Sequence, residues 1–366
     1  MEKIVYNVLK LLEDNNFEAY IVGGYVRDFL LNKKTKDIDI CTNARPKDMM
    51  NLFNNEKITI LEYGNVILEI NDYKFEITTF RKDITYKDAR KPVEILYIDT
   101  LDEDLLRRDF TINAICMNKD GKIIDKLNGI KDLKKRLITT IGDPDEKFKE
   151  DALRMMRAIR FASVLEFLID EKVKKAIRNN KELLRGLSYE RKKEELNKIF
   201  ATKNKKYAVS LIRELELEDV LELENIDVIT KTNHIIGIWA MITSKNYAFT
   251  KEEKKTISLI KELYDKDLYN SKVLYEYGIY PVDIVCDIRG LNKKKIFKLY
   301  DRLPIKDRNE INISPLEICD LFDSLGGSFI KDVYEDLEDQ ILTFKLKNKK
   351  EDIKRYIIKK YDIIHK

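Results

Sequence analysis

The stretch that decides the fold is EAYIVGGYVRDFLLNKKTKDIDICT, residues 18–42. Its first part, residues 18–24, is an apolar run that ends on two glycines, which favours a β-strand followed by a turn. A second short strand is expected over DIDICT, residues 37–42. Because side chains two residues apart on a strand share a face, Asp37 and Asp39 are predicted to point to one spot.

Two carboxylates at one spot suit Mg²⁺, which takes oxygen ligands and keeps positions for water and substrate phosphates. By itself such a pair is more often two solvated acids at a strand edge. The paired glycines upstream, Gly23 and Gly24, let the backbone approach phosphate oxygens, and Arg27 could add a charge-assisted bond. Together these features predict a phosphate cradle beside a metal site. Glu76 is a weaker candidate for a third acid, with Glu69 or a structural role as plausible.

The composition is that of a globular chain long enough for two or more domains, with 366 residues, 44% hydrophobic and 37% charged. The formal net charge of +4 is too small to indicate a nucleic-acid partner. Four cysteines without a CxxC pair favour reduced thiols and a cytoplasmic protein, and two histidines leave little for a zinc site or a Ser/His/Asp triad. We expect no signal peptide and no membrane span. The sequence does not indicate an oligomeric state.

Strand and helix patterns alternate only in the first part of the chain. Residues 3–15 have helical spacing of apolar positions, and residues 65–80 alternate around Asn71-Asp72, which predicts a hairpin. From about residue 145 onward every pattern is helical. The predicted fold class is therefore α+β, with a head built on a small mixed β-sheet followed by an all-helical remainder.

Four motifs occur in order along the chain: GGYVRD (23–28), KDIDI (36–40), RRDFTINAI (107–115) and EDALRMMRAIRF (150–161). In this order and spacing they resemble the class II tRNA nucleotidyltransferases, the CCA-adding enzymes, whose head is shared with bacterial poly(A) polymerases. The similarity covers most of the chain. Further similar stretches lie at residues 80–95, 188–196 and 303–308. Neither histidine is in an HD dipeptide, so the similarity is to the Bacillus-like type without an HD domain.

The resemblance implies four domains: a nucleotidyltransferase head (1–142), a helical neck that recognises the base (143–204), a helical body (205–300) and a helical tail that binds tRNA (301–366). It implies template-independent addition of C, C and A to the tRNA 3′ end from CTP and ATP, with release of pyrophosphate. Asp37 and Asp39 would hold two catalytic Mg²⁺ ions. The partners implied are tRNA, CTP and ATP, with no membrane.

The resemblance also assigns nucleotide contacts to the later motifs. Arg108 and Asp109 would lie near the ribose. Asp151 and Arg154, placed at i and i+3 on one face of one helix, would read the base together with Arg157. An Asp carboxylate accepts from the exocyclic amine of cytosine or adenine, whereas uracil and guanine present a carbonyl there, so the pair would select C and A. Out of this context, such a pair is usually a surface ion pair.

Two further segments are assigned by resemblance. The polar stretch 80–95 is similar to a flexible loop implicated in the change from C to A addition, with Asp83 and Arg90 as lever arms. Residues 341–366 carry nine Lys and Arg against three Asp and Glu, which suits contact with the tRNA backbone. Both segments could instead be solvated surface.

Several alternatives stay open. An enzyme that adds only the terminal A would share every motif, and a bacterial poly(A) polymerase would share the head. A non-catalytic RNA-binding paralogue would be marked by loss of a metal carboxylate or of the EDxxR pair, and neither is missing. A small-molecule nucleotidyltransferase would share the metal chemistry but not the EDxxR motif or the long helical part.

Overall fold

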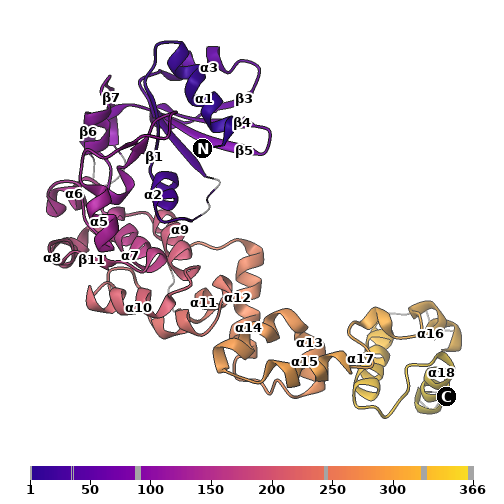
Figure 1. Cartoon of the computed structure of the whole chain (residues 1–366). Coiled ribbons are helices and arrows are strands. Elements are labelled where there is room, and N and C mark those ends of the chain that lie inside the picture. Colours follow the sequence, from indigo (N-terminus) through magenta and orange to yellow (C-terminus); the bar gives the residue numbers. More distant parts are fainter. Residues whose placement is uncertain are drawn as a thin grey trace. The chain divides into compact units, whose positions relative to one another are not determined.

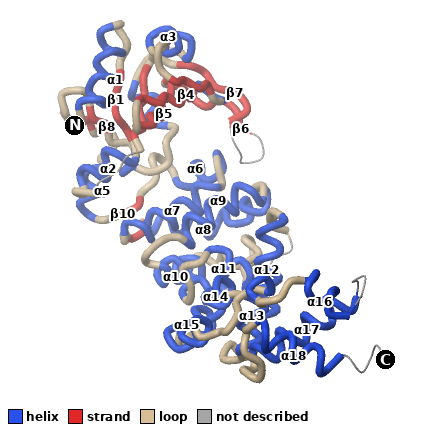
Figure 2. The backbone as a smooth tube through the Cα atoms, turned by 90° about the vertical axis from the view of Figure 1, so that its right-hand side faces the viewer, coloured by secondary structure: helices blue, strands red, loops and turns tan. Residues whose placement is uncertain are grey.

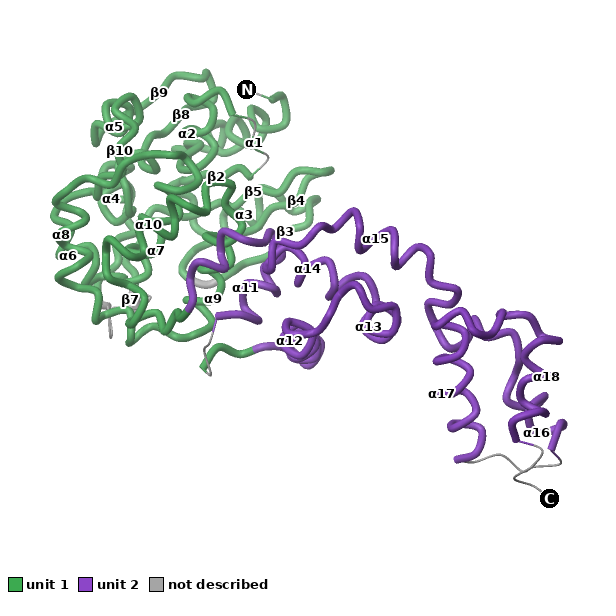
Figure 3. The backbone as a smooth tube through the Cα atoms, turned by 90° about the horizontal axis from the view of Figure 1, so that it is seen from below, with its two compact units in different colours: residues 1–224, 244–248 green, residues 225–243, 249–366 purple. Residues whose placement is uncertain are grey.

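The computed structural model describes residues 2–33, 35, 37–86, 92–242, 246–322 and 328–361. The chain forms two compact units, shown in green and purple in Figure 3. Unit 1 comprises Met1–Glu224 and Ser244–Ala248, and unit 2 comprises Asn225–Thr243 and Phe249–Lys366. All the motifs quoted above between residues 23 and 161 therefore fall in unit 1.

A seven-stranded mixed sheet is the centre of the N-terminal half of unit 1 (Figures 1 and 2). Its strand order is β3-β4-β5-β2-β1-β8-β9, and every neighbouring pair is antiparallel except β2 and β5, which are parallel. The strands are β1 (Ala19–Val22), β2 (Ile38–Thr42), β3 (Lys57–Ile60), β4 (Asn65–Ile70), β5 (Tyr73–Thr79), β8 (Cys116–Met117) and β9 (Ile123–Ile124). The predicted small mixed sheet is confirmed.

The hairpin predicted over residues 65–80 is formed by β4 and β5, in register from Asn65↔Thr78 to Ile70↔Tyr73. Asn71 takes the left-handed conformation with φ 52°, which asparagine tolerates in a tight turn. Alternate residues of β5, including Phe75 and Ile77, are fully buried. This inward alternation is the period-2 pattern that predicted the hairpin.

Five short helices accompany the sheet in the head. They are α1 (Lys3–Asp14), α2 (Gly24–Leu30), α3 (Pro46–Leu52), α4 (Leu101–Leu106) and α5 (Gly129–Lys135). Helix α1 buries Val5, Leu9 and Leu12, one helical stripe, and contacts β1. Helix α2 contacts both β1 and β2, so the chain returns to the sheet immediately after the glycine turn.

Five helices complete unit 1: α6 (Pro144–Glu150), α7 (Leu153–Leu165), α8 (Glu171–Asn180), α9 (Tyr189–Phe200) and α10 (Lys205–Glu214). Helix α6 begins at Pro144, where Asp143 caps it by accepting from the Glu146 N–H at 3.1 Å. One short strand interrupts the helical region. Strand β11 (Leu168–Ile169) pairs in parallel with β10 (Leu137–Ile138), so the expectation of helix alone beyond residue 145 was wrong at this point.

The stretch 80–95 does not form a loop throughout. Strands β6 (Arg81–Tyr86) and β7 (Pro92–Tyr97) pair antiparallel from Arg81↔Tyr97, with a bulge after Asp83. Arg90 lies outside the described residues. The side chain of Asp83 is paired with Arg81, from Nε to Oδ1 at 3.2 Å, and is largely buried.

In the described part of unit 2 the regular secondary structure is all helical, joined by turns and loops. Its helices are α11 (Ile235–Met241), α12 (Lys251–Leu263), α13 (Ser271–Tyr277), α14 (Ile279–Arg289), α15 (Lys293–Asp301), α16 (Pro315–Phe322), α17 (Ser328–Leu342) and α18 (Lys350–Tyr361). Trp239 is buried and packs edge-on against Phe249, as expected for a core residue. No helix in the described part of the chain is long and apolar enough to cross a membrane. The α+β fold class is confirmed.

Candidate active site

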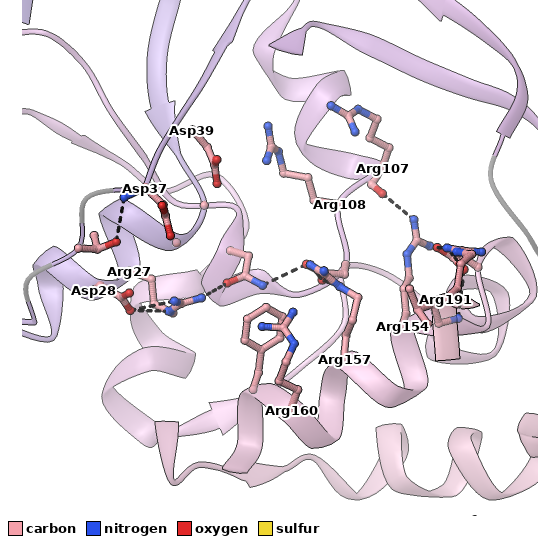
Figure 4. A pocket seen from close by; sticks show the side chains of 18 residues that line it. Arg27, Asp28, Asp37, Asp39, Arg107, Arg108, Arg154, Arg157, Arg160 and Arg191 are labelled. Carbon is pink, nitrogen blue, oxygen red and sulfur yellow. Dashed lines mark hydrogen bonds and ion pairs between the residues drawn. The ribbon is translucent and has the colours of Figure 1, made fainter. Parts of the chain in front are cut away.

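A cavity of about 560 Å³ in unit 1 brings most of the predicted site residues together (Figure 4). Its walls come from the β1–α2 turn, the start of β2, residues 107–113, the start of α7 and one residue of α9. The predicted residues that line it are Gly23, Gly24, Arg27, Asp37, Asp39, Arg108, Asp109, Asp151, Arg154 and Arg157. Glu76 and Asp83 are described but are not among the lining residues.

The glycine turn lies directly against the carboxylate of Asp39. Gly23 has φ 77° and ψ −134°. Glycine adopts this backbone conformation at low free-energy cost, and residues with a Cβ atom do not. A Cβ atom at Gly23 would lie 3.1 Å from Oδ2 of Asp39, closer than ordinary contact. The residue is therefore a glycine for two independent reasons, its φ and its neighbour.

The acidic pair lies at the N-terminal end of β2. Asp39 is opposite Val22 of β1 and beside Glu76 of β5 in the sheet, and Asp37 precedes the first strand residue by one position. Burial raises the pKa of Asp39 to about 6, and the negative charges of Glu76 and Asp37 add to this, while Arg108 and Arg27 act in the opposite direction. Unfavourable ionisation of this kind is relieved by a bound cation.

The ligand set at this end of the sheet fits a hard divalent ion that keeps much of its own hydration. Asp37 and Asp39 both border the cavity, and Figure 4 shows their carboxylates near one another. Among the described residues no group of three or more His, Cys, Asp or Glu side chains is arranged to hold a metal. Glu76 lies beside Asp39 in the sheet but does not line the cavity, and its part as a third acid stays a prediction. Two carboxylates with water and phosphate oxygens completing the shell are a usual arrangement for Mg²⁺.

Arg27 and the RRD motif are joined by a buried chain of hydrogen bonds. Arg27 donates from Nη1 to Oδ1 of Asn113 at 2.7 Å, and Asn113 donates from Nδ2 to Oδ1 of Asp109 at 3.1 Å. Arg157 then donates from Nε to Oδ2 of Asp109 at 2.7 Å. Burial alone would raise the pKa of Asp109, but Arg157 and the bonds from Asn113 and the Phe110 N–H outweigh it and lower the pKa to about 2.

The two arginines of the RRD motif share a buried partner that the motifs did not reveal. Asp104 accepts from Nη2 of Arg108 at 3.0 Å and from Nε of Arg107 at 2.9 Å. The Asp104 side chain has no exposed surface. Asp104 therefore fixes the direction of both guanidinium groups at the edge of the cavity.

The placement of Asp151 and Arg154 on one helix was wrong. Helix α6 ends at Glu150, Asp151 is extended with φ −148° and ψ 106°, and α7 begins at Leu153. Arg191 of α9 holds the Asp151 carboxylate, with Nη2 at 3.2 and 3.0 Å from its two oxygens. This tertiary bond keeps the acid on an extended connection, yet Asp151 and Arg154 still line the same cavity.

The Arg154 guanidinium is held by the end of α6 and by the RRD segment. It donates to the carbonyl of Lys147 at 3.0 Å and to the carbonyl of Arg107 at 2.8 Å, and it forms an ion pair with Glu150. Arg154 is 7% exposed. Its side chain is therefore oriented by backbone acceptors from both sides of the cavity.

Besides Asp28, Thr35 and Arg107, four lining residues with a chemical part in the cavity were not predicted from the sequence as site residues: Asn113, Arg160, Phe161 and Arg191. The Phe161 ring lies under three guanidinium groups, with the centroid 5.3 Å from Arg27, 5.2 Å from Arg157 and 4.1 Å from Arg160. A signal existed for each, because Asn113, Arg160 and Phe161 fall inside quoted motifs and Arg191 lies in SYERKKEEL, residues 188–196.

The balance of charge in the cavity is positive. Among the described residues, seven arginines and five aspartates line it. The arginines extend from the glycine turn to α9, while Asp37 and Asp39 lie together at one end. Such a cavity can bind a polyanion along its length and a cation at one end.

Comparison with known proteins agrees with this geometry. Residues 19–139 match the family described as the poly A polymerase head domain, and residues 166–225 match a family described as a probable RNA and SrmB-binding site of polymerase A. The chain is 34% identical to a CCA-adding enzyme of Anoxybacillus flavithermus, covering 96% of this chain and 95% of the relative. It is 35% identical to a CCA-adding enzyme of Listeria innocua, covering 96% of both.

Solved structures give the same result for the fold. The CCA-adding enzyme of Bacillus stearothermophilus in complex with CTP superposes with a TM-score of 0.84 at 25% identity, over 100% of this chain and 99% of that one. The Thermotoga maritima CCA-adding enzyme complexed with tRNA has a TM-score of 0.73 at 20% identity, over 98% and 96%. With relatives above 30% identity aligned over nearly its full length, the chain belongs to the CCA-adding enzyme family of nucleotidyltransferases.

Proposed function

We propose that this protein adds C, C and A to the 3′ end of tRNA, taking the nucleotides from CTP and ATP and releasing pyrophosphate. The observation that carries the proposal is the single cavity lined by the glycine turn, the acidic pair and the arginines of α7. Its relatives named as CCA-adding enzymes, and the related structures named as complexes with CTP, ATP and tRNA, support the choice of substrates.

In this proposal different residues of the cavity bind different parts of the nucleotide. Asp37 and Asp39 would hold Mg²⁺, which when bound supplies activation of the RNA 3′-hydroxyl and neutralises charge on the phosphates. The backbone at Gly23 and Gly24 and the Arg27 guanidinium orient the triphosphate. The ribose lies at Arg108 and Asp109.

The base is read by Asp151, Arg154 and Arg157 in the same proposal. Arg191 fixes the direction in which the Asp151 carboxylate points, because its Nη2 contacts both oxygens. That carboxylate accepts a hydrogen bond from the amine of cytosine or adenine and repels the carbonyl of uracil or guanine. Selection is therefore made by protein side chains that are held in place before the nucleotide enters.

A nucleotide-by-nucleotide assay tests the activity. The protein is incubated with Mg²⁺ and tRNAs that end at the discriminator base, at C or at CC, with one labelled nucleotide supplied at a time. We expect C addition to the first two and A addition to the third. A addition confined to the CC end would instead identify an A-only enzyme, unlimited A addition a poly(A) polymerase, and no addition an RNA-binding paralogue.

The acidic pair is tested by Asp39→Ala. Loss of a metal ligand at the reacting phosphate removes several kcal/mol of transition-state stabilisation, so we expect kcat/KM to fall at least about 10³-fold. The Kd for tRNA should stay within about twofold of wild type. A variant that retains normal transfer would place the metal elsewhere. Glu56→Gln, at an exposed residue that does not line the cavity, serves as the comparison, and we expect it to keep wild-type activity.

The base-reading group is tested by Arg154→Ala. We expect the ratio of kcat/KM for CTP over UTP to fall at least about tenfold, because a bond to a charged group contributes about 1.5–3 kcal/mol. Mg²⁺ dependence of the remaining transfer should match wild type. Discrimination against UTP at the wild-type level would contradict the role of this arginine.

A further inference from the structure

The site contains a closed ring of five side chains that links the glycine turn to α7. Its hydrogen-bonded arc runs from Arg27 through Asn113 and Asp109 to Arg157. The Phe161 ring closes it, because the guanidinium carbons of Arg27 and Arg157 lie 5.3 and 5.2 Å from its centroid. Figure 4 shows the dashed path between the two labelled arginines.

Asn113 is the neutral member of the hydrogen-bonded arc, and it uses both ends of its amide. Its oxygen faces a cation and its nitrogen faces a carboxylate, so only one orientation of the amide satisfies both neighbours. Asn113 ends the short helical turn η2 (Thr111–Asn113) and is 7% exposed. A water molecule from bulk solvent therefore cannot easily replace either bond.

Arg27 and Arg157, at the two ends of the hydrogen-bonded arc, belong to different parts of the proposed nucleotide site. Arg27 stands beside the glycine turn proposed for the triphosphate, and Arg157 is on the helix proposed to read the base. Both oxygens of Asp109 accept hydrogen bonds: Oδ1 accepts from Asn113 and the Phe110 N–H, and Oδ2 accepts from Arg157. Arg27 also pairs with Asp28, from Nη2 to Oδ1 at 2.8 Å. The bonds through Asn113 and Asp109 give a path by which a change at Arg27 can reach Arg157.

We propose that Asn113 is a positioning residue that makes base selection depend on occupation of the triphosphate cradle. The proposal rests on the proposed nucleotide transfer and adds a coupling between its two ends. It predicts that a nucleotide is discriminated well only when its phosphates engage Arg27. Asn113 itself touches no substrate in this scheme.

Three variants separate positioning from simple packing. Asn113→Leu removes both bonds at similar volume, and we expect the CTP over UTP affinity ratio to fall about tenfold, since bonds to charged groups are removed. Asn113→Asp keeps an oxygen for Arg27 but places a second carboxyl group against Asp109 in place of the amide donor. It should hold CTP affinity within about threefold while the CTP over UTP ratio falls. Asn51→Leu, an exposed site in α3, is the matched control and should change neither.

A double-mutant cycle gives the deciding measurement. Equilibrium Kd values for CTP and UTP are determined for Arg27→Met in the wild-type and in the Asn113→Leu background, with tRNA affinity and thermal unfolding as checks on folding. In the wild-type background we expect Arg27→Met to lower the ratio of CTP affinity to UTP affinity. In the Asn113→Leu background the same substitution should leave this ratio unchanged. The proposal would be overturned if Arg27→Met lowered the affinity ratio equally in both backgrounds. It would also be overturned if Asn113→Leu and Asn113→Asp kept the wild-type ratio of CTP to UTP affinity.

The measurement is independent of the proposed activity, because it requires no transfer. If wild type adds C to tRNA but the cycle shows no coupling, only the role of Asn113 fails. If wild type binds CTP with the expected coupling but adds nothing to tRNA, the proposed function fails and the coupling stands.

Discussion

At residue 23 the backbone and the neighbouring carboxylate both restrict the side chain to a hydrogen atom. The conformation with φ 77° and ψ −134° costs about 1–3 kcal/mol for a residue with a Cβ. In addition, a Cβ atom at residue 23 would lie 3.1 Å from Oδ2 of Asp39 and would displace this proposed metal ligand. The two effects can be told apart, because only the second should reach the chemistry.

Gly121 provides the comparison, since it has φ 78° with nothing near the position of its Cβ. We expect both Gly23→Ala and Gly121→Ala to lose stability in urea unfolding, about 1–3 kcal/mol each, because both positions have a positive φ. Only Gly23→Ala should lose nucleotide transfer, at least about tenfold in kcat/KM, because it alone moves Asp39. Equal activity of the two variants would show that Asp39 tolerates the shift.

Charged residues in short, regularly spaced motifs could be predicted from the sequence. Residues whose bonding partners lie far away in the sequence could not. Asp37, Asp39, Arg27 and Asp151 were selected from short motifs, and all four border the cavity. Asn113 lies in a quoted motif but carries no charge, and its bond to Arg27 spans 86 positions of sequence. Only the folded chain brings these two side chains together.

At the scale of elements, the sequence indicated the strands and helices but not the break at Asp151. EDALRMMRAIRF is composed largely of good helix formers, so its local propensity favours one uninterrupted helix. The observed break coincides with tertiary contacts, since Arg191 of α9 holds the Asp151 carboxylate and Arg154 donates to the Arg107 carbonyl at 2.8 Å. Boundaries set by such contacts are beyond what spacing can predict.

The β6–β7 pair is the element to test for the change from C to A addition. Its strands form a hairpin in which Asp83 pairs with Arg81, and the Asp83 side chain is 7% exposed. Asp83→Ala removes this internal link. We expect A addition to tRNA ending in CC to fall at least about fivefold, while C addition stays within about twofold, since one ion pair with a buried partner contributes about 1 kcal/mol or more.

The control for this element is Asp72→Ala, in the exposed turn between β4 and β5. It should leave both additions unchanged. If Asp83→Ala lowers C and A addition equally, the hairpin has a general structural role and the lever-arm assignment is wrong.

At the scale of the molecule, the net charge of +4 is small although the C-terminal stretch, residues 341–366, is strongly basic. Some of its cations are engaged, as Lys360 is with Asp336 at 2.6 Å and Lys350 is with Glu317. Exposed lysines that have no ion-pair partner among the described residues remain available for phosphate contacts. These include Lys349 and Lys359.

Replacing these two lysines by glutamine should weaken tRNA binding without changing CTP binding. Removal of one phosphate contact reduces the slope of log Kd against log salt by roughly 0.7–0.9. We therefore expect a slope smaller by up to about 1.4–1.8 in filter-binding titrations. The same substitutions at Lys134 and Lys135 of α5 are the matched control, and an equal effect there would argue against a special role of the tail.

The path of the chain between the two units has a practical consequence for anyone who wants to divide the protein. After Glu224 the chain enters unit 2, returns for Ser244–Ala248, and leaves again. The returning segment fills a place in unit 1: Tyr247 is buried, packs edge-on against Tyr189 and donates to the Leu221 carbonyl at 2.8 Å. A fragment cut at residue 224 would expose a hole where that ring sits. Transplanting the N-terminal part onto another helical partner therefore requires carrying residues 244–248 as well, because the chain passes between the units at three points.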